Sequence, residues 1–273
     1  MMGEGVAHVA AVDHSPGRER AAWFSRPVIV FATAYIIITV IHESTHALTA
    51  YALNVPFTLY HFAVNLSRDR GTLTERAAIG VAGPLCALLV GLICWFFYRR
   101  ARGSRPELLL LYLTTFGVGT FFGNLISTTF VGDFVGDFSR AAVALRLPMA
   151  ARYAVSLIGL LSLGGLMFAA GWGLRRLSPA GSTRSRAMIL MVVLPAVIGV
   201  AIVTLASLPM PSTLILGRLT EILFWVFGAV GLLMSRSIPS GGRNLHVGWT
   251  DVVLLAAALI TVRVMAGGFS FQQ

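Results

Sequence analysis

Charged residues are scarce in this chain, and lysine is absent. Only 12% of the 273 residues are charged, whereas 56% are hydrophobic and the mean hydropathy is +0.80. A soluble domain usually carries about twice this share of charged residues. The composition therefore excludes a soluble globular protein and predicts an integral membrane protein that crosses the bilayer several times.

Cysteine is also rare, which excludes a disulfide-rich scaffold. Cys86 and Cys94 are the only two cysteines, and both lie within one apolar run. This spacing does not indicate a disulfide framework. We interpret both side chains as small members of a hydrophobic core.

The charges that are present are mostly basic: 21 arginines face 11 acidic residues, for a formal net charge of +10. The arginines cluster in short stretches between apolar runs. Such clusters are typical of membrane topology signals and of contacts with lipid headgroups. We therefore expect the lipid bilayer as a partner and no binding of nucleic acid.

Seven apolar segments approach the length of about 20 residues that a membrane helix needs. They run at about 27–52, 77–98, 108–131, 153–174, 187–208, 214–235 and 249–267. We therefore expect an all-α polytopic membrane protein with about six to seven transmembrane helices, in the cell membrane of a bacterium. Residues 1–26 are polar and lack an apolar core, so we expect them to form a flexible tail.

One stretch between the first two apolar segments has a different pattern. Side chains alternate over 57–64, and Asp69-Arg70-Gly71 offers a turn before Thr72. This pattern predicts a short β-hairpin. An amphiphilic loop at the membrane interface is the alternative.

Small residues recur at helix-packing spacing in the second and third apolar segments. They are Gly83, Ala87 and Gly91 in the second, and Gly119 and Gly123 in the third. Small residues four apart let helices approach closely in lipid. We expect both segments to pack tightly against neighbours.

The most informative motif is His42-Glu43-Ser44-Thr45-His46, an H-E-x-x-H sequence inside the first apolar segment. Residues four apart share one face of a helix, so His42 and His46 can bind one metal ion. Glu43 is then placed to take a proton from a metal-bound water. Ionisable side chains at membrane depth are costly, which favours a functional role over chance.

Catalytic zinc usually has three protein ligands and an open position for water, so one more ligand is needed. Asp133 and Asp137 lie at the end of the third apolar segment, in a glycine-containing bend. Either can complete the site while the other caps the following helix. The spacing leaves both open.

Three pieces of this chain, in order, resemble the site-2 proteases, a family of intramembrane zinc metalloproteases. They are His42-Glu43-Ser44-Thr45-His46, Ala82-Gly83-Pro84-Leu85, and Asn124-Leu125-Ile126, which leads to an aspartate. Two departures stand out: Ser127 replaces a usual proline, and a phenylalanine, Phe134 or Phe138, follows the aspartate where glycine is usual. These departures concern the third ligand more than the fold.

The resemblance implies a zinc endopeptidase that cleaves transmembrane or membrane-proximal segments of a membrane protein substrate. It implies Zn²⁺ held by His42, His46 and a later aspartate, for which we take Asp137, with Asp133 as the alternative. Glu43 would be the catalytic acid and base, and Asn124 would contribute to substrate binding.

The resemblance also divides the chain. Residues 27–145 would form a three-helix metalloprotease core, and 146–273 would add further transmembrane helices. A non-catalytic metal-binding relative that acts as a binding partner is the main alternative. A transporter is disfavoured because the fourth to sixth apolar segments contain almost no polar residues. The sequence leaves the oligomeric state open.

Overall fold

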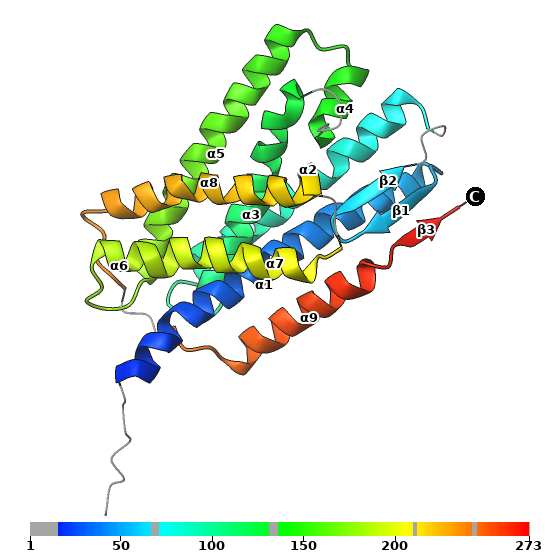
Figure 1. The fold of residues 1–273 in the computed structure, drawn as a ribbon. Coiled ribbons are helices and arrows are strands. Elements are labelled where there is room, and N and C mark those ends of the chain that lie inside the picture. Colours follow the sequence, from blue (N-terminus) through cyan, green and yellow to red (C-terminus); the bar gives the residue numbers. More distant parts are fainter. Residues whose placement is uncertain (1–15, 67–70, 131–135, 210–211, 242–244, 273) are drawn as a thin grey trace, which may run out of the picture.

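The computed structural model describes residues 16–66, 71–130, 136–209, 212–241 and 245–272. Within these ranges it describes the side chains from residue 25 on, except those of residues 212–221. The chain is mainly helical, with one small sheet (Figure 1). The elements in order are α1 (Pro16–Ala52), β1 (Phe57–Tyr60), β2 (Ala63–Leu66), α2 (Leu73–Arg100), α3 (Glu107–Ile126), the 3-10 turn η1 (Ser127–Thr129), α4 (Asp137–Ala144), α5 (Met149–Leu177), α6 (Arg184–Met188), the π-helical turns η2 (Ile189–Val193) and η3 (Pro195–Gly199), α7 (Val200–Ala206), α8 (Ser212–Met234), α9 (Trp249–Met265) and β3 (Phe269–Phe271).

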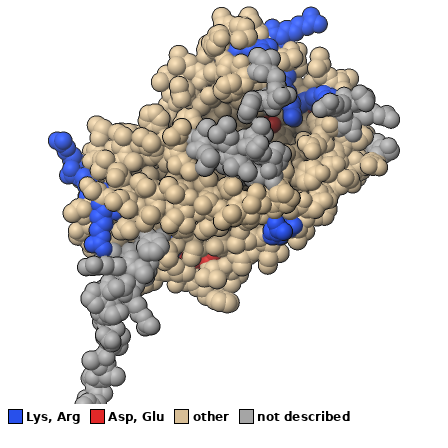
Figure 2. Space-filling view, viewed as in Figure 1, with Lys and Arg blue, Asp and Glu red and all other residues tan. Residues whose placement is uncertain are grey.

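Five helical stretches of the described residues are long and apolar enough to cross a membrane. They are Ser25–Ala52, Leu73–Arg100, Glu107–Thr129, Met149–Leu177 and Arg184–Ala206. The face seen in Figure 2 is mostly uncharged, with basic side chains in a few separate groups and very little acidic surface. These features are consistent with an all-α polytopic membrane protein. The other two predicted segments coincide with α8 and α9, and their crossing of a membrane remains a prediction.

The predicted flexible tail is too long, because α1 already begins at Pro16. Arg26, the last residue of that predicted tail, is buried. Its Nε lies 3.1 Å from the Asp251 carboxylate, and its Nη2 donates a hydrogen bond of 2.7 Å to the carbonyl oxygen of Arg105. At Arg26, α1 therefore packs into the protein through a charge pair that only the tertiary fold brings together.

An aromatic cluster packs around α1. Phe31 is fully buried, and its ring centroid lies 4.8–5.3 Å from those of Tyr112, Phe116 and Trp225. These partners belong to α3 and α8. Burial of large aromatic side chains is a major stabilising contribution, and the pairs with Tyr112 and Phe116 are edge-to-face. The cluster holds α1 rigidly on the helices around it.

The small residues of α2 lie at helix contacts, as expected. Ala87 is buried, and a side chain at Gly91 would collide with the backbone of Gly117 and Val118 on α3. The expectation for α3 is less accurate. Gly119 has room for an ordinary contact, Gly123 faces open space, and Gly117 makes the close approach instead.

The strands form a sheet in the order β2-β1-β3. β1 pairs antiparallel with β2, from Phe57 opposite Leu66 to Tyr60 opposite Ala63. The turn between β1 and β2 therefore lies at His61-Phe62. The predicted turn at 69–71 cannot be compared, since Asp69 and Arg70 lie outside the described residues. β3 pairs with the other side of β1. The outer edge of β2 is consequently free of sheet partners among the described strands.

Thr72 caps the start of α2 and does not belong to a strand. Its hydroxyl accepts a hydrogen bond from the backbone N–H of Glu75, and the Glu75 carboxylate accepts one from the Thr72 N–H. This reciprocal capping box satisfies two N–H groups that a helix start otherwise leaves unpaired. It explains why the helix begins at this point.

Candidate metal centre

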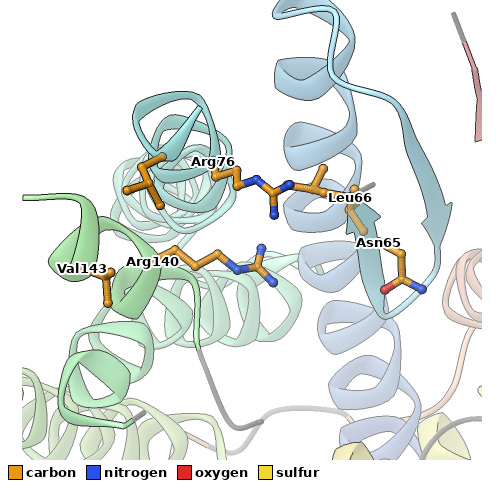
Figure 3. Close-up of a pocket in the computed structure, with 7 residues that line it drawn as sticks. Asn65, Leu66, Arg76, Arg140 and Val143 are labelled. Atoms are coloured by element: carbon orange, nitrogen blue, oxygen red, sulfur yellow. The ribbon is translucent and has the colours of Figure 1, made fainter. Parts of the chain in front are cut away.

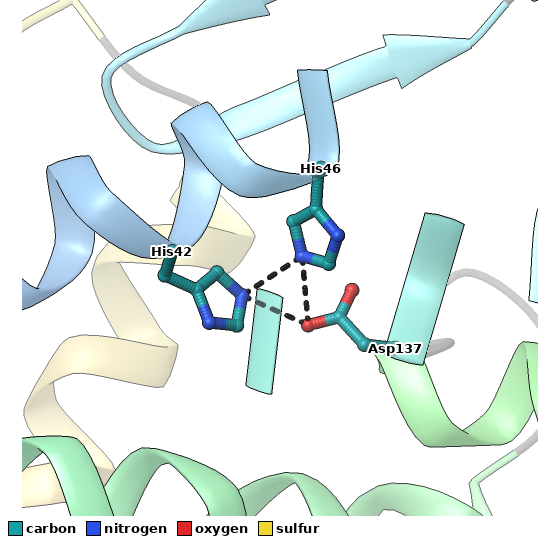
Figure 4. A group of neighbouring side chains, drawn as sticks. All are labelled: His42, His46 and Asp137. Carbon is teal, nitrogen blue, oxygen red and sulfur yellow. Dashed lines mark hydrogen bonds and ion pairs between the residues drawn. The ribbon is translucent and has the colours of Figure 1, made fainter. Parts of the chain in front are cut away.

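Two histidines of α1 point to the same place. His42 and His46 lie one helical turn apart, and their Nε2 atoms are 2.9 Å from each other. Both side chains are buried, with 9% and 5% of their surface exposed. Figure 4 shows the two rings extending from one face of α1 toward the start of α4. The helical period thus places both imidazoles as the motif predicts.

The third member of the group is Asp137, the first residue of α4. Its Oδ2 lies 3.0 Å from His42 Nε2 and 3.4 Å from His46 Nε2. A carboxylate in the first turn of a helix is favoured by the partial positive charge of the exposed N–H groups there. The structure therefore joins His42, His46 and Asp137, whereas the alternative, Asp133, lies outside the described residues.

The spacing of these three atoms suits a tetrahedral metal ion. Zinc bonds to nitrogen and oxygen of about 2.0–2.1 Å place neighbouring ligand atoms about 3.3 Å apart. The observed separations range from 2.9 to 3.4 Å. No fourth histidine, cysteine, aspartate or glutamate joins this group within the described ranges. Three ligands with one open position are typical of catalytic zinc sites.

The hydrogen bond of His46 to the backbone orients its ring for metal binding. His46 Nδ1 donates a hydrogen bond of 2.5 Å to the carbonyl oxygen of Ile79 on α2. This bond leaves Nε2 as the ring nitrogen that faces His42 and Asp137. Nε2 would bind a metal ion through its lone pair when it carries no proton.

Asp137 is ready to act as a ligand at neutral pH. Burial would by itself raise its pKa, but the contacts with His42 and His46 outweigh burial and hold the pKa of this carboxyl well below its usual range. The carboxylate is therefore ionised. Metal ligands of this type must be deprotonated, so the electrostatics agree with the geometry.

Glu43 follows the first histidine on α1 and is buried, with 9% of its surface exposed. It lies near enough to His46 for their charges to interact. Within the described residues it is not one of the grouped metal ligands. Glu43 is thus a buried carboxylate next to a ligand residue, and its predicted role in proton transfer remains a prediction.

Two glycines of α2 and the glycine before α4 create the space for the group. A β-carbon at Gly83 would overlap the His46 imidazole, and one at Gly80 would come within 2.8 Å of the Asp137 carbonyl oxygen. A β-carbon at Gly136 would overlap the Ser127 side chain. The sequence signalled Gly83 as a packing residue and as part of the Ala82-Gly83-Pro84-Leu85 motif, but nothing in it identified the carbonyl of Ile79 as a hydrogen-bond acceptor.

The two residues that depart from the site-2 protease pattern lie where α4 meets the end of α3. The Ser127 carbonyl oxygen accepts a hydrogen bond of 2.5 Å from the Ser139 hydroxyl, which joins the end of α3 to the first turn of α4. Phe138 packs edge-to-face on Phe121, with centroids 5.5 Å apart. Both contacts help hold Asp137 where it meets the histidines.

Asn124 lies on the last turn of α3, near this junction. Its side-chain nitrogen donates to the Thr120 carbonyl oxygen, and its Oδ1 is the atom nearest to Gly136 after the Ser127 side chain. It is half-buried. The structure thus places Asn124 beside Gly136, the residue before Asp137, and its predicted role in substrate binding remains a prediction.

A scan of family models, a search of curated proteins and a search of solved structures found no match to this chain. The resemblance to the site-2 proteases therefore remains a prediction from the residues quoted for it.

Proposed function

We propose that this protein is a membrane-embedded zinc metalloendopeptidase that cleaves transmembrane or membrane-proximal segments of another membrane protein. The observation that carries the proposal is the convergence of His42, His46 and Asp137, from two helices, on one buried point. Its support includes the intact Glu43 beside that point. A bacterial cell membrane remains the expected location, from the sequence alone.

The residues divide the chemistry among them. His42, His46 and Asp137 would hold Zn²⁺, which lowers the pKa of a bound water to about 7 and so supplies hydroxide at neutral pH. Glu43 would accept the proton of that water and return it to the leaving amine. The hydrogen bond from His46 to the Ile79 carbonyl would keep the imidazole in the required tautomer and orientation.

A substrate helix hides its peptide bonds in its own hydrogen bonds, so cleavage requires an unwound segment. The outer edge of β2 offers a place for one. In a two-residue hairpin the residues next to the turn, Tyr60 and Ala63, exchange hydrogen bonds, so Val64 and Leu66 direct their N–H groups outward. We propose that an extended substrate segment pairs with this edge by strand addition.

The strand-addition step can be tested at Leu66. The Leu66→Pro variant is expected to cut substrate about tenfold more slowly than Leu66→Ala, because both lose the leucine side chain but only proline loses the outward N–H. Cleavage rates and thermal stability of the two purified variants give the comparison. Equal cleavage by two equally folded variants would remove strand addition from the mechanism.

Metal content and cleavage together test the proposed function. We expect about one zinc per purified wild-type chain, and cleavage of a model single-span substrate that a chelator abolishes and added zinc restores. Asp137→Asn should lose the ion, whereas the matched Asp133→Asn variant should keep it. Zinc bound normally in both variants would contradict the three-ligand site, and bound zinc without any cleavage would favour a non-catalytic metal-binding protein.

A further inference from the structure

A cavity of about 600 Å³ opens beside the free edge of β2 (Figure 3). Its walls come from β2, from the first turns of α2 and from α4. The lining residues are Val64, Asn65, Leu66, Leu73, Arg76, Arg140 and Val143. The cavity is thus bordered by outward-facing backbone on one side and by two arginines on the other.

The two arginines give the cavity a positive charge. Figure 3 shows Arg76 on α2 and Arg140 on α4 extending in the same direction, toward β2. Arg76 Nε donates a long hydrogen bond of 3.4 Å to the Gly71 carbonyl oxygen. Arg140 is half-buried and has no hydrogen-bond or ion-pair partner in the part of the chain that the structure describes. No acidic residue is among the described residues that line the cavity.

The cavity adjoins the candidate metal centre. Arg140 follows Asp137 by three residues on α4, which is about 4.5 Å along a helix axis. Gly80 on α2 lies against the same part of α4 that carries Asp137 and Arg140. A β-carbon at Gly80 would lie within 4 Å of both the Asp137 carbonyl and the Arg140 β-carbon. A peptide that pairs with β2 would therefore lie beside the cavity, whose Arg140 wall is about one helical turn from Asp137.

We propose that this cavity is a specificity pocket for an acidic side chain of the substrate segment, an aspartate or a glutamate, which Arg140 and Arg76 bind. The inference rests on the proposed function and extends it to substrate choice. Guanidinium groups match the planar shape of a carboxylate and form charge-assisted hydrogen bonds with it. Side chains on a strand alternate in direction, so only every second substrate residue can enter the pocket.

The pocket is tested with paired substrates. A model single-span substrate carries one glutamate at successive positions around the cut site, and each is compared with its glutamine counterpart. We expect one position at which glutamate raises kcat/KM about tenfold over glutamine. Arg140→Gln should abolish this preference, and Arg140→Glu should reverse it in favour of lysine at the same position. Arg146→Gln, the same charge change at an exposed site after α4, should keep the preference.

Equal cleavage of glutamate and glutamine substrates at every position, or an unchanged preference in Arg140→Gln, would overturn the pocket. If the wild type cleaves no substrate at all, the proposed function fails, and the pocket is then judged by fluorescence anisotropy with labelled glutamate and glutamine peptides. Tighter binding of the glutamate peptide that Arg140→Gln removes would support it. If Arg140→Gln weakens only binding to anionic phospholipid vesicles, the site takes a lipid headgroup and the proposal is overturned.

Discussion

Cleavage by the Glu43→Gln variant is expected to fall by roughly a thousandfold while zinc stays bound. A general acid–base group contributes about 10²–10⁴ to a rate, and Glu43 would serve in both directions of proton transfer. Glutamine keeps the size of the side chain, and Glu43 is outside the group of described ligands. The measurements are zinc content by mass spectrometry and cleavage rate on the same sample.

Glu75→Gln is the matched control for this change. It makes the same substitution on α2, where the side chain closes a capping box in which glutamine also serves. We expect it to keep both zinc and cleavage. Full cleavage by Glu43→Gln would show that another group transfers the proton. Loss of zinc in Glu43→Gln would instead mean that Glu43 contributes to holding the metal.

The Gly83→Ala variant is expected to bind zinc about a hundredfold more weakly and to lose cleavage. Its added methyl group would overlap the His46 imidazole, so the ring has to move. Movement of the ring would break its hydrogen bond to the Ile79 carbonyl and take Nε2 away from Asp137. Loss of a hydrogen bond that orients a metal ligand typically lowers metal affinity by about 10- to 100-fold. Zinc titration of the purified variant measures the loss.

Gly123→Ala makes the same change on α3, at a position with no atom within 4 Å of the added carbon. We expect unchanged zinc affinity and a fold as stable as the wild type or more so, because alanine favours a helix over glycine by up to about 1 kcal/mol. Wild-type zinc affinity in Gly83→Ala would show that the space left by Gly83 is not required for the metal site.

Much of the fold follows from local patterns that the sequence shows directly. Apolar length identified the five stretches that are long enough to cross a membrane, because the bilayer thickness sets the length of a helix. The predicted tail extended too far into α1, because a charged residue such as Arg26 is typical of a polar tail. Its partner, Asp251, is 225 residues away in the chain, so the local sequence does not show the pair. The turn of the sheet was misplaced, because strand alternation continues across His61-Phe62 and contains no turn signal there.

The part of the site on α1 can be predicted from local sequence. The helical period places His42 and His46 on one face, with Glu43 directly after His42, so this spacing alone predicts a metal site. The other features require the tertiary structure: Asp137 meets both histidines, Gly83 leaves room for His46, and an arginine-lined cavity adjoins the free edge of β2. These features depend on contacts between elements far apart in the chain, and no local periodicity encodes which elements will meet.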